Sequence, residues 1–157
     1  MNKDYLNIYN NLVNFSRNKD IYSIFTKNDN FSDRLIILMF HFAFFLRNFN
    51  KIQKKEEMQN IYDFFFRQLE LSIREIGYGD ATINKKMKIY INTFHSMIIK
   101  IKDWENISIS KKNEVIKDFI NIDTNIDELS KYFDNYSNYL INNPFNLFTK
   151  SVIKTKF

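Results

Sequence analysis

The amino-acid sequence predicts an all-α protein, a single-domain bundle of about six to seven helices without a sheet. Apolar residues recur with the helical period of 3.6 residues through most of the chain. Only 2 glycines and 1 proline occur, too few for the many chain reversals of a β-fold. Because the chain has 157 residues and 45% of them are hydrophobic, we expect residues 1–157 to form one domain with a sizeable core.

The N-terminal third of the chain leads to a strongly apolar helix. Helical spacing predicts a first helix over residues 4–17 and a short second piece over 21–25. A polar break, Asn-Asp-Asn at 28–30, precedes a helix over 33–49. Its middle, 35–46, is apolar on every side, which places it at the centre of the bundle or against a partner. These twelve residues would rise only about 18 Å as a helix, too short to cross a bilayer.

Apolar stripes predict further helices downstream, after a charged linker at 51–57. Their expected ranges are 56–76, about 84–104, 110–121 and, starting at Asp123 or Thr124, up to residue 140. The tail contains the only proline, Pro144, and ends with basic residues.

Both glycines lie in one elbow between two predicted helices. Gly77 is expected at the C′ position of the helix before the elbow, and Gly79 at a second tight bend. We expect neither position to accommodate a side chain. Gly79→Val should therefore distort the elbow, since a β-branched residue resists positive φ.

Three lysines follow the elbow, in the expected first turn of the next helix. A helix N-terminus carries partial positive charge, so Lys85, Lys86 and Lys88 would be at the unfavourable end. Either Asp80 offsets them from within the chain, or an external anion does so from outside. The sequence leaves both alternatives open.

No pattern in the sequence predicts an enzyme, a cofactor or a metal site. Cysteine is absent, which excludes disulfides and thiol catalysis. His41 is the only polar side chain between Arg34 and Arg47, and a lone histidine in such a helix is usually a core residue with one hydrogen bond. The only other histidine, His95, has no evident carboxylate partner for a metal. We find no nucleophile–base pair and no phosphate-binding loop.

The net charge of +5 and the pI near 9.2 have two explanations. One is an anionic partner, such as RNA or a lipid surface. The other is lysine drift onto solvated faces in an AT-rich genome, which the even spread of the charges favours. No apolar segment follows Met1, so we expect no signal peptide and a soluble protein that at most binds a membrane peripherally.

A series of motifs runs through about residues 8–95. The first of them are Ile8-Tyr9, Arg17, Tyr22, Asp33-Arg34, His41 and Arg47. The most specific is Arg74-Glu75-Ile76-Gly77-Tyr78-Gly79-Asp80, followed by Ile83-Asn84-Lys85-Lys86-Met87-Lys88. In these motifs, residues 5–104 resemble the ubiquinol–cytochrome c chaperone family, whose members are assembly factors for the cytochrome bc1 complex. Residues 105–157 carry no such resemblance.

The chain departs from the family pattern at several positions. The family has Leu, Leu and Pro where this chain has Ile73, Ala81 and Asn84. The Phe-Tyr-Gly-Arg of the family falls on residues 94–97, which read Phe-His-Ser-Met. The family arginine is therefore missing, and whatever it contacts must differ here.

The resemblance implies an all-α, non-enzymatic chaperone without cofactor that binds newly made cytochrome b, or an early bc1 intermediate, through an apolar and aromatic surface. It implies a small partner protein or the ribosome as further partners. Because no transit peptide is visible, it implies a bacterial-type member that is cytoplasmic and peripheral at the inner membrane, whereas eukaryotic relatives are mitochondrial. The expected partner-binding or structural residues of the elbow are Arg74, Glu75, Gly77, Gly79, Asp80, Lys85, Met87 and Lys88, and the other family-like positions are Tyr22, Arg34, His41 and Arg47.

Two questions about this implied function stay open. Arg74, Glu75 and Asp80 either form an internal network that locks the elbow or contact a partner directly. The alternative function is an RNA- or ribosome-binding helical adaptor, although no nucleic-acid motif is present. Steeply salt-dependent RNA binding would favour that alternative.

Overall fold

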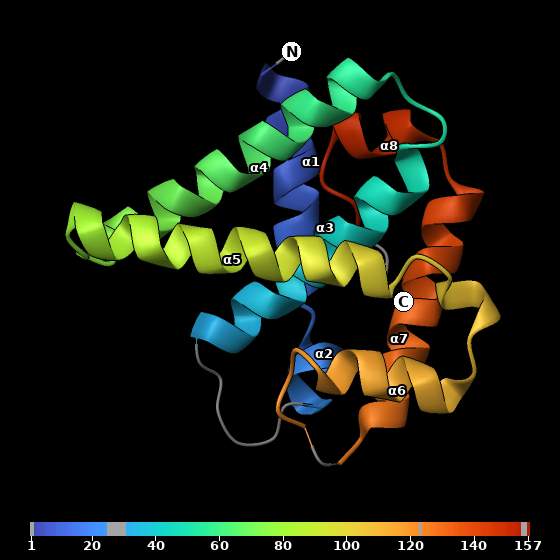
Figure 1. Cartoon of the computed structure of the whole chain (residues 1–157). Coiled ribbons are helices and arrows are strands. Elements are labelled where there is room, and N and C mark those ends of the chain that lie inside the picture. Colours follow the sequence, from blue (N-terminus) through green and yellow to red (C-terminus); the bar gives the residue numbers. More distant parts are fainter. Residues whose placement is uncertain (1, 25–30, 123, 155–156) are drawn as a thin grey trace.

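The computed structural model describes residues 2–24, 31–122, 124–154 and 157, and within these residues all regular structure is helical (Figure 1). The α-helices are α1 (Asn2–Ser16), α2 (Lys19–Ile24), α3 (Phe31–Phe49), α4 (Lys55–Glu75), α5 (Asp80–Lys100), α6 (Ile109–Lys117), α7 (Ile126–Asn142) and α8 (Phe145–Lys150). A single 3-10 turn, η1 (Trp104–Asn106), follows α5. The predicted all-α class is confirmed.

Helix α3 is the centre of the structure. It packs against α1, α5 and α7, and its residues from Ile37 to Leu46 are all buried. Its aromatic side chains pair with rings from other helices. Phe42 stacks on Phe65 of α4 at 3.9 Å between ring centroids, and Phe44 stacks on Phe133 of α7 at 5.4 Å. A helix that is apolar all round can only be stable when neighbours cover every side, as they do here.

Helices α4 and α5 form a long hairpin whose elbow extends to one side of the molecule (Figure 1). Its inner faces are apolar, and Phe66 and Phe94 meet edge to face at 5.2 Å. The outer end is solvated, because every residue from Arg74 to Thr82 is exposed. The elbow is therefore held by its own local contacts and the hairpin behind it.

The C-terminal segment is bound to α1 by a row of asparagine side chains. Asn7 donates to the carbonyl of Thr149 at 2.7 Å, and Asn14 donates to that of Ile153 at 2.9 Å. Asn11, which is fully buried, lies between them and makes three hydrogen bonds, one to Phe148 in α8 and two to Ser151 and Ile153 after it. Side-chain amides thus satisfy backbone groups in the last turn of α8 and in the irregular residues that follow it.

Three predicted helix boundaries are four residues off in the second half of the chain. Helix α5 begins at Asp80 and ends at Lys100, four residues before the expected start and end, and α6 ends at Lys117 instead of residue 121. After α6 the chain leaves the helix, and Ile120 and Ile122 are both buried in the core. Three expected features lie outside the described residues: the break at 28–30, the end of the short piece at residue 25, and the alternative start at residue 123.

Candidate functional site

An ion pair closes the elbow between α4 and α5. Arg74 in the last turn of α4 donates from Nη1 to the Asp80 carboxylate at 2.6 Å, and its Nη2 lies 3.8 Å from Glu70 Oε1. The neighbouring carboxylates raise the pKa of Arg74 above its usual value, with the Asp80 hydrogen bond as the largest cause. Arg74, Glu75 and Asp80 were the residues considered for an internal network, and the structure brings Arg74 and Asp80 together.

Glu75 takes no part in this ion pair. It lines a cavity of about 270 Å³ between α1, α3 and α4. Tyr9, Arg17 and Arg34 line the same cavity, so three residues of the family-like motifs and one elbow residue lie around it. The side chain of Tyr22 on α2 lies outside the described residues.

The two glycines of the elbow have different roles. Gly77 follows the last residues of α4 with φ +103°, a left-handed conformation that glycine adopts without strain, so its expected C′ role is confirmed. Gly79 has φ −73° and ψ 161°, and no atom lies within 4 Å of where its Cβ would be. The expectation that no side chain fits there, and that Gly79→Val is excluded by positive φ, is wrong. Gly79 is instead the N-cap of α5, in extended backbone that any residue adopts.

The lysines after the elbow are not in the first turn of α5. Because Gly79 caps the helix and its carbonyl accepts from Ile83 N at 3.0 Å, Asp80 occupies the first turn. That is the favourable end for a carboxylate, so the expected repulsion between three lysines and the helix N-terminus does not arise. Lys85 and Lys88 are exposed one and two turns further on, and Lys86 lies 4.7 Å from the centroid of the Tyr78 ring.

Met87 is the one predicted elbow residue that the structure buries. It is 8% exposed and belongs to the main core cluster. Its side chain therefore contributes to the packing between α5 and the core, in contrast to the exposed lysines beside it.

His41 is a fully buried core residue, as expected, but it makes two ring hydrogen bonds instead of one. Its Nδ1 donates to the Ile37 carbonyl at 2.7 Å, and its Nε2 lies 2.7 Å from the Tyr132 hydroxyl. Burial lowers the pKa of His41 to about 4, so the ring is neutral at pH 7. Among the described residues, no group of three or more His, Asp or Glu side chains could hold a metal ion.

Arg47 connects the end of α3 to the turn after α5. Its Nη1 donates to Glu105 Oε1 at 2.7 Å, its Nη2 pairs with the other carboxylate oxygen, and its Nε donates to the Lys102 carbonyl at 3.2 Å. The Arg47 hydrogen bond is the main cause that lowers the pKa of Glu105 to about 2. The sequence did not reveal this pairing, because Glu105 follows the family-like segment.

A groove between the end of α3, the start of α4 and the second half of α5 is a further candidate that sequence reasoning missed. We call it the α3–α5 groove. Its volume is about 610 Å³. Its apolar floor is made by Leu46, Met58, Phe94 and Ile98, and its polar rim by Asn50, Gln53, Lys55, Gln59, Tyr62 and His95. The Tyr62 hydroxyl and His95 Nε2 form a hydrogen bond of 2.9 Å across the rim. The only sequence signal was a histidine, His95, directly after Phe94 of the apolar stripe.

Taken together, these features define a helical protein in which a buried apolar helix supports a projecting α-hairpin. The family model described as Ubiquinol-cytochrome C chaperone matches residues 24–103, just over half of the 157 residues, from the end of α2 to the turn after α5. The chain belongs to the ubiquinol-cytochrome c chaperone family.

The crystal structure of the Cbp3 homolog from Brucella abortus has the same fold, with a TM-score of 0.74 at 20% sequence identity. The alignment covers 97% of this chain and 89% of that chain, so the similarity includes the helices after residue 104. No curated protein matches the sequence. Within the described residues, no helix has both the length and the apolar character needed to cross a bilayer.

Proposed function

We propose that this chain is an assembly chaperone that binds newly made cytochrome b, or an early intermediate of the bc1 complex, without catalysing a reaction. The observation that carries the proposal is the family match over α3, α4 and α5, which includes the elbow and the α3–α5 groove. Because cytochrome b is a membrane protein, we propose that the chaperone acts at the cytoplasmic side of the inner membrane. We further propose that it acts together with a small partner protein.

The α3–α5 groove is the client-binding surface that we favour. Cytochrome b is a very hydrophobic membrane protein, so its nascent segments need apolar contacts until they are assembled. The groove provides an apolar floor with Met58 and Phe94, and thioether and aromatic side chains suit contacts with varied sequences. Ile52, 68% exposed in the loop before α4, adds apolar surface near the rim residue Gln53.

The function is tested by deleting the gene and recording spectra of the membrane cytochromes. We expect loss of the b- and c1-type haem signals of the assembled bc1 complex, and recovery when the gene is restored. Unchanged b- and c1-type haem levels would overturn the assembly function.

The surface is tested by photo-crosslinking from two matched positions. A photoreactive residue replaces Gln59 on the groove rim or Asn138, which is exposed on α7. We expect newly made cytochrome b to crosslink to position 59 and not to position 138. Gln59→Trp, which places bulk into the groove from an exposed site, should reduce assembly, whereas Asn138→Trp should not. Equal crosslinking from both positions would contradict the groove assignment.

A further inference from the structure

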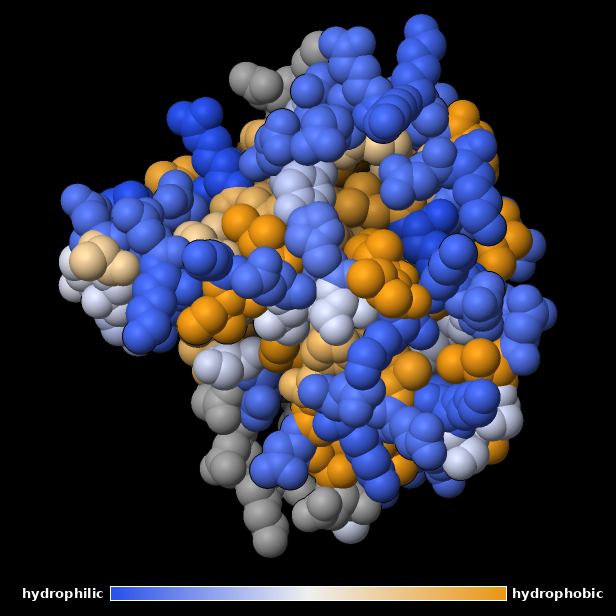
Figure 2. Space-filling model, in the orientation of Figure 1, coloured by the Kyte–Doolittle hydropathy of each residue, from blue (hydrophilic) through white to orange (hydrophobic). Residues whose placement is uncertain are grey.

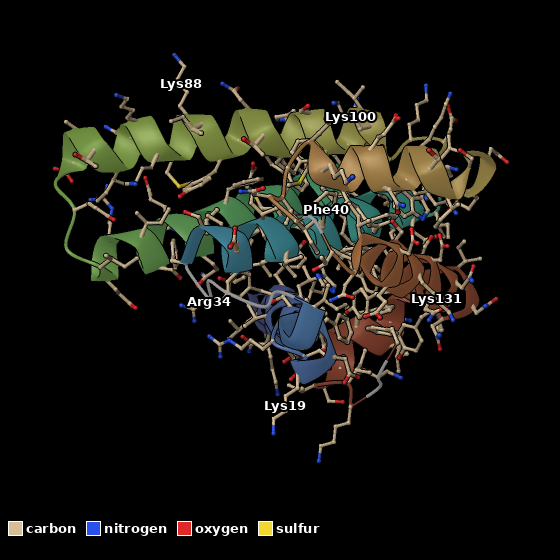
Figure 3. All side chains as sticks on the ribbon, turned by 90° about the horizontal axis from the view of Figure 1, so that it is seen from below. Lys19, Arg34, Phe40, Lys88, Lys100 and Lys131 are labelled. Carbon is tan, nitrogen blue, oxygen red and sulfur yellow. The ribbon has the colours of Figure 1, made fainter. Side chains whose placement is uncertain are left out.

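The outward side of α5 combines exposed lysines with exposed isoleucines. We call it the outer face of α5, defined by Lys85, Lys88, Ile89, Asn92, Ile99 and Lys100, all of which are exposed. In Figure 3, Lys88 projects from α5 away from α4 and from the interior that contains Phe40. Figure 2 shows hydrophobic residues interspersed with hydrophilic ones over this face.

Positive charge is concentrated on α5 compared with the other long helices. It carries four lysines and a single acidic residue, Asp80, which is already paired with Arg74. Helix α4 has five acidic and three basic residues, and α7 has three acidic residues and one lysine. The hairpin is therefore basic on the side of α5, although its other helix is acidic.

Some of this charge has no internal partner. Lys100 forms an ion pair with Asp118, and Lys86 covers the Tyr78 ring. Within the described part of the chain, Lys85 and Lys88 form no ion pair. Both precede the exposed Ile89, within about one helical turn. These two lysines are free to meet an external anion.

The isoleucines extend the same face along the helix. Ile89 is 54% exposed and Ile99 is 74% exposed, the highest value among the large hydrophobic side chains of the described residues. Ten residues separate them, which corresponds to about 15 Å along an α-helix. Lysines and large aliphatic residues on one helix face are typical of helices that lie in the interface of a membrane.

We propose that the outer face of α5 binds the surface of an anionic lipid bilayer. The lysines would meet the headgroup phosphates while Ile89 and Ile99 enter the boundary with the acyl chains. RNA fits this face less well, because Phe94 is buried, Tyr90 is half-buried and the exposed His95 ring is hydrogen-bonded to Tyr62. This inference rests on the proposed function in one respect, because a chaperone for a membrane protein works close to a bilayer.

The test is flotation of the purified full chain with lipid vesicles that contain no client. Vesicles of phosphatidylcholine with phosphatidylglycerol should bind the chain, and pure phosphatidylcholine vesicles should bind it much more weakly. Lys85→Glu together with Lys88→Glu should weaken the partition coefficient at least about tenfold. Ile89→Asn together with Ile99→Asn should weaken it about threefold or more, with the charge unchanged.

The matched control changes the same charge elsewhere. Lys19 projects on the side opposite α5 and Lys131 lies on α7, so Lys19→Glu together with Lys131→Glu should change the partition less than about twofold (Figure 3). Equal losses in the two double variants, or no binding to anionic vesicles, would overturn the proposal. It would also be overturned if a single-stranded RNA bound through Lys85 and Lys88 while vesicles did not. Because no client is present, these outcomes are independent of the cytochrome assay.

Discussion

His41 and Tyr132 share a hydrogen bond of 2.7 Å inside the core, although 91 positions separate them in the sequence. Since His41 Nδ1 faces the Ile37 carbonyl, an acceptor, Nδ1 carries the proton of the neutral ring. His41 Nε2 is then the acceptor, and the Tyr132 hydroxyl donates to it. Both ring nitrogens of neutral His41 therefore have a hydrogen-bond partner, which favours the uncharged form. The bond to Tyr132 also links α3 to α7.

This arrangement predicts that stability falls in mild acid. The folded-state pKa of His41 is about 4, below the unfolded value of 6.5, so the unfolded chain binds a proton first as the pH falls. Stability is therefore lost from about pH 6.5 down to pH 4, by about 2 kcal/mol between pH 7.5 and pH 5. Urea unfolding at a series of pH values measures this loss.

Two variants isolate the role of His41 in this loss. His95→Asn keeps the buried His41–Tyr132 hydrogen bond, so we expect the loss to persist in this variant. His41→Leu together with Tyr132→Phe replaces both hydrogen-bonding partners with apolar groups and should remove most of the loss. If the double variant kept the full dependence on pH, another group would be responsible.

The Arg47–Glu105 pair predicts a second loss at lower pH. The folded pKa of Glu105 is about 2 and its ordinary value is 4.5, so the stabilisation is present above pH 4.5 and disappears as the pH falls towards 2. More than a third of the Glu105 side chain is exposed, so solvent screening reduces the contribution to about 1 kcal/mol. Glu105→Gln should remove that amount at pH 7, measured by urea unfolding. Asp118→Asn, at the exposed pair with Lys100, is the matched control and should cost at most about 0.5 kcal/mol.

The elbow predicts opposite results for the same substitution two residues apart. Gly77→Ser should cost about 1–2 kcal/mol, because a side chain is strained at φ +103°. Gly79→Ser should be neutral or stabilise the protein by about 0.5 kcal/mol, since serine is a good N-cap and the space around Gly79 is open. Thermal unfolding of the two variants checks the difference. Similar losses in both would mean that Gly79 also needs a special conformation.

Asn11 predicts how firmly the C-terminal segment is held. Asn11→Ala removes hydrogen bonds to the carbonyls of Phe148 and Ser151 and to the amide of Ile153. Buried backbone groups without partners are costly, so we expect a loss of about 3 kcal/mol and faster hydrogen exchange at the Ile153 amide. Asn10→Ala, at an exposed position on the same helix, should change stability by at most about 0.5 kcal/mol. An Ile153 amide that stayed equally protected in the Asn11 variant would contradict this role.

The sequence by itself determined features that depend on local pattern. The apolar run of α3 predicted its central place, because a helix without a polar face has to be covered on all sides. The C′ role of Gly77 followed from the glycine and the end of the apolar stripe. The family motifs, which are continuous segments of the chain, were recognisable for the same reason.

Only the tertiary structure decided where distant segments meet. The start of α5 at Asp80 was missed because the apolar period is clear only from Met87 onwards, and this placed the lysines in the wrong turn. The sequence also did not predict the partner of Arg47, the α3–α5 groove or the contacts of Asn11. Each of them joins residues from different helices, and the spacing of residues along one helix contains no information about which helix will pack beside it.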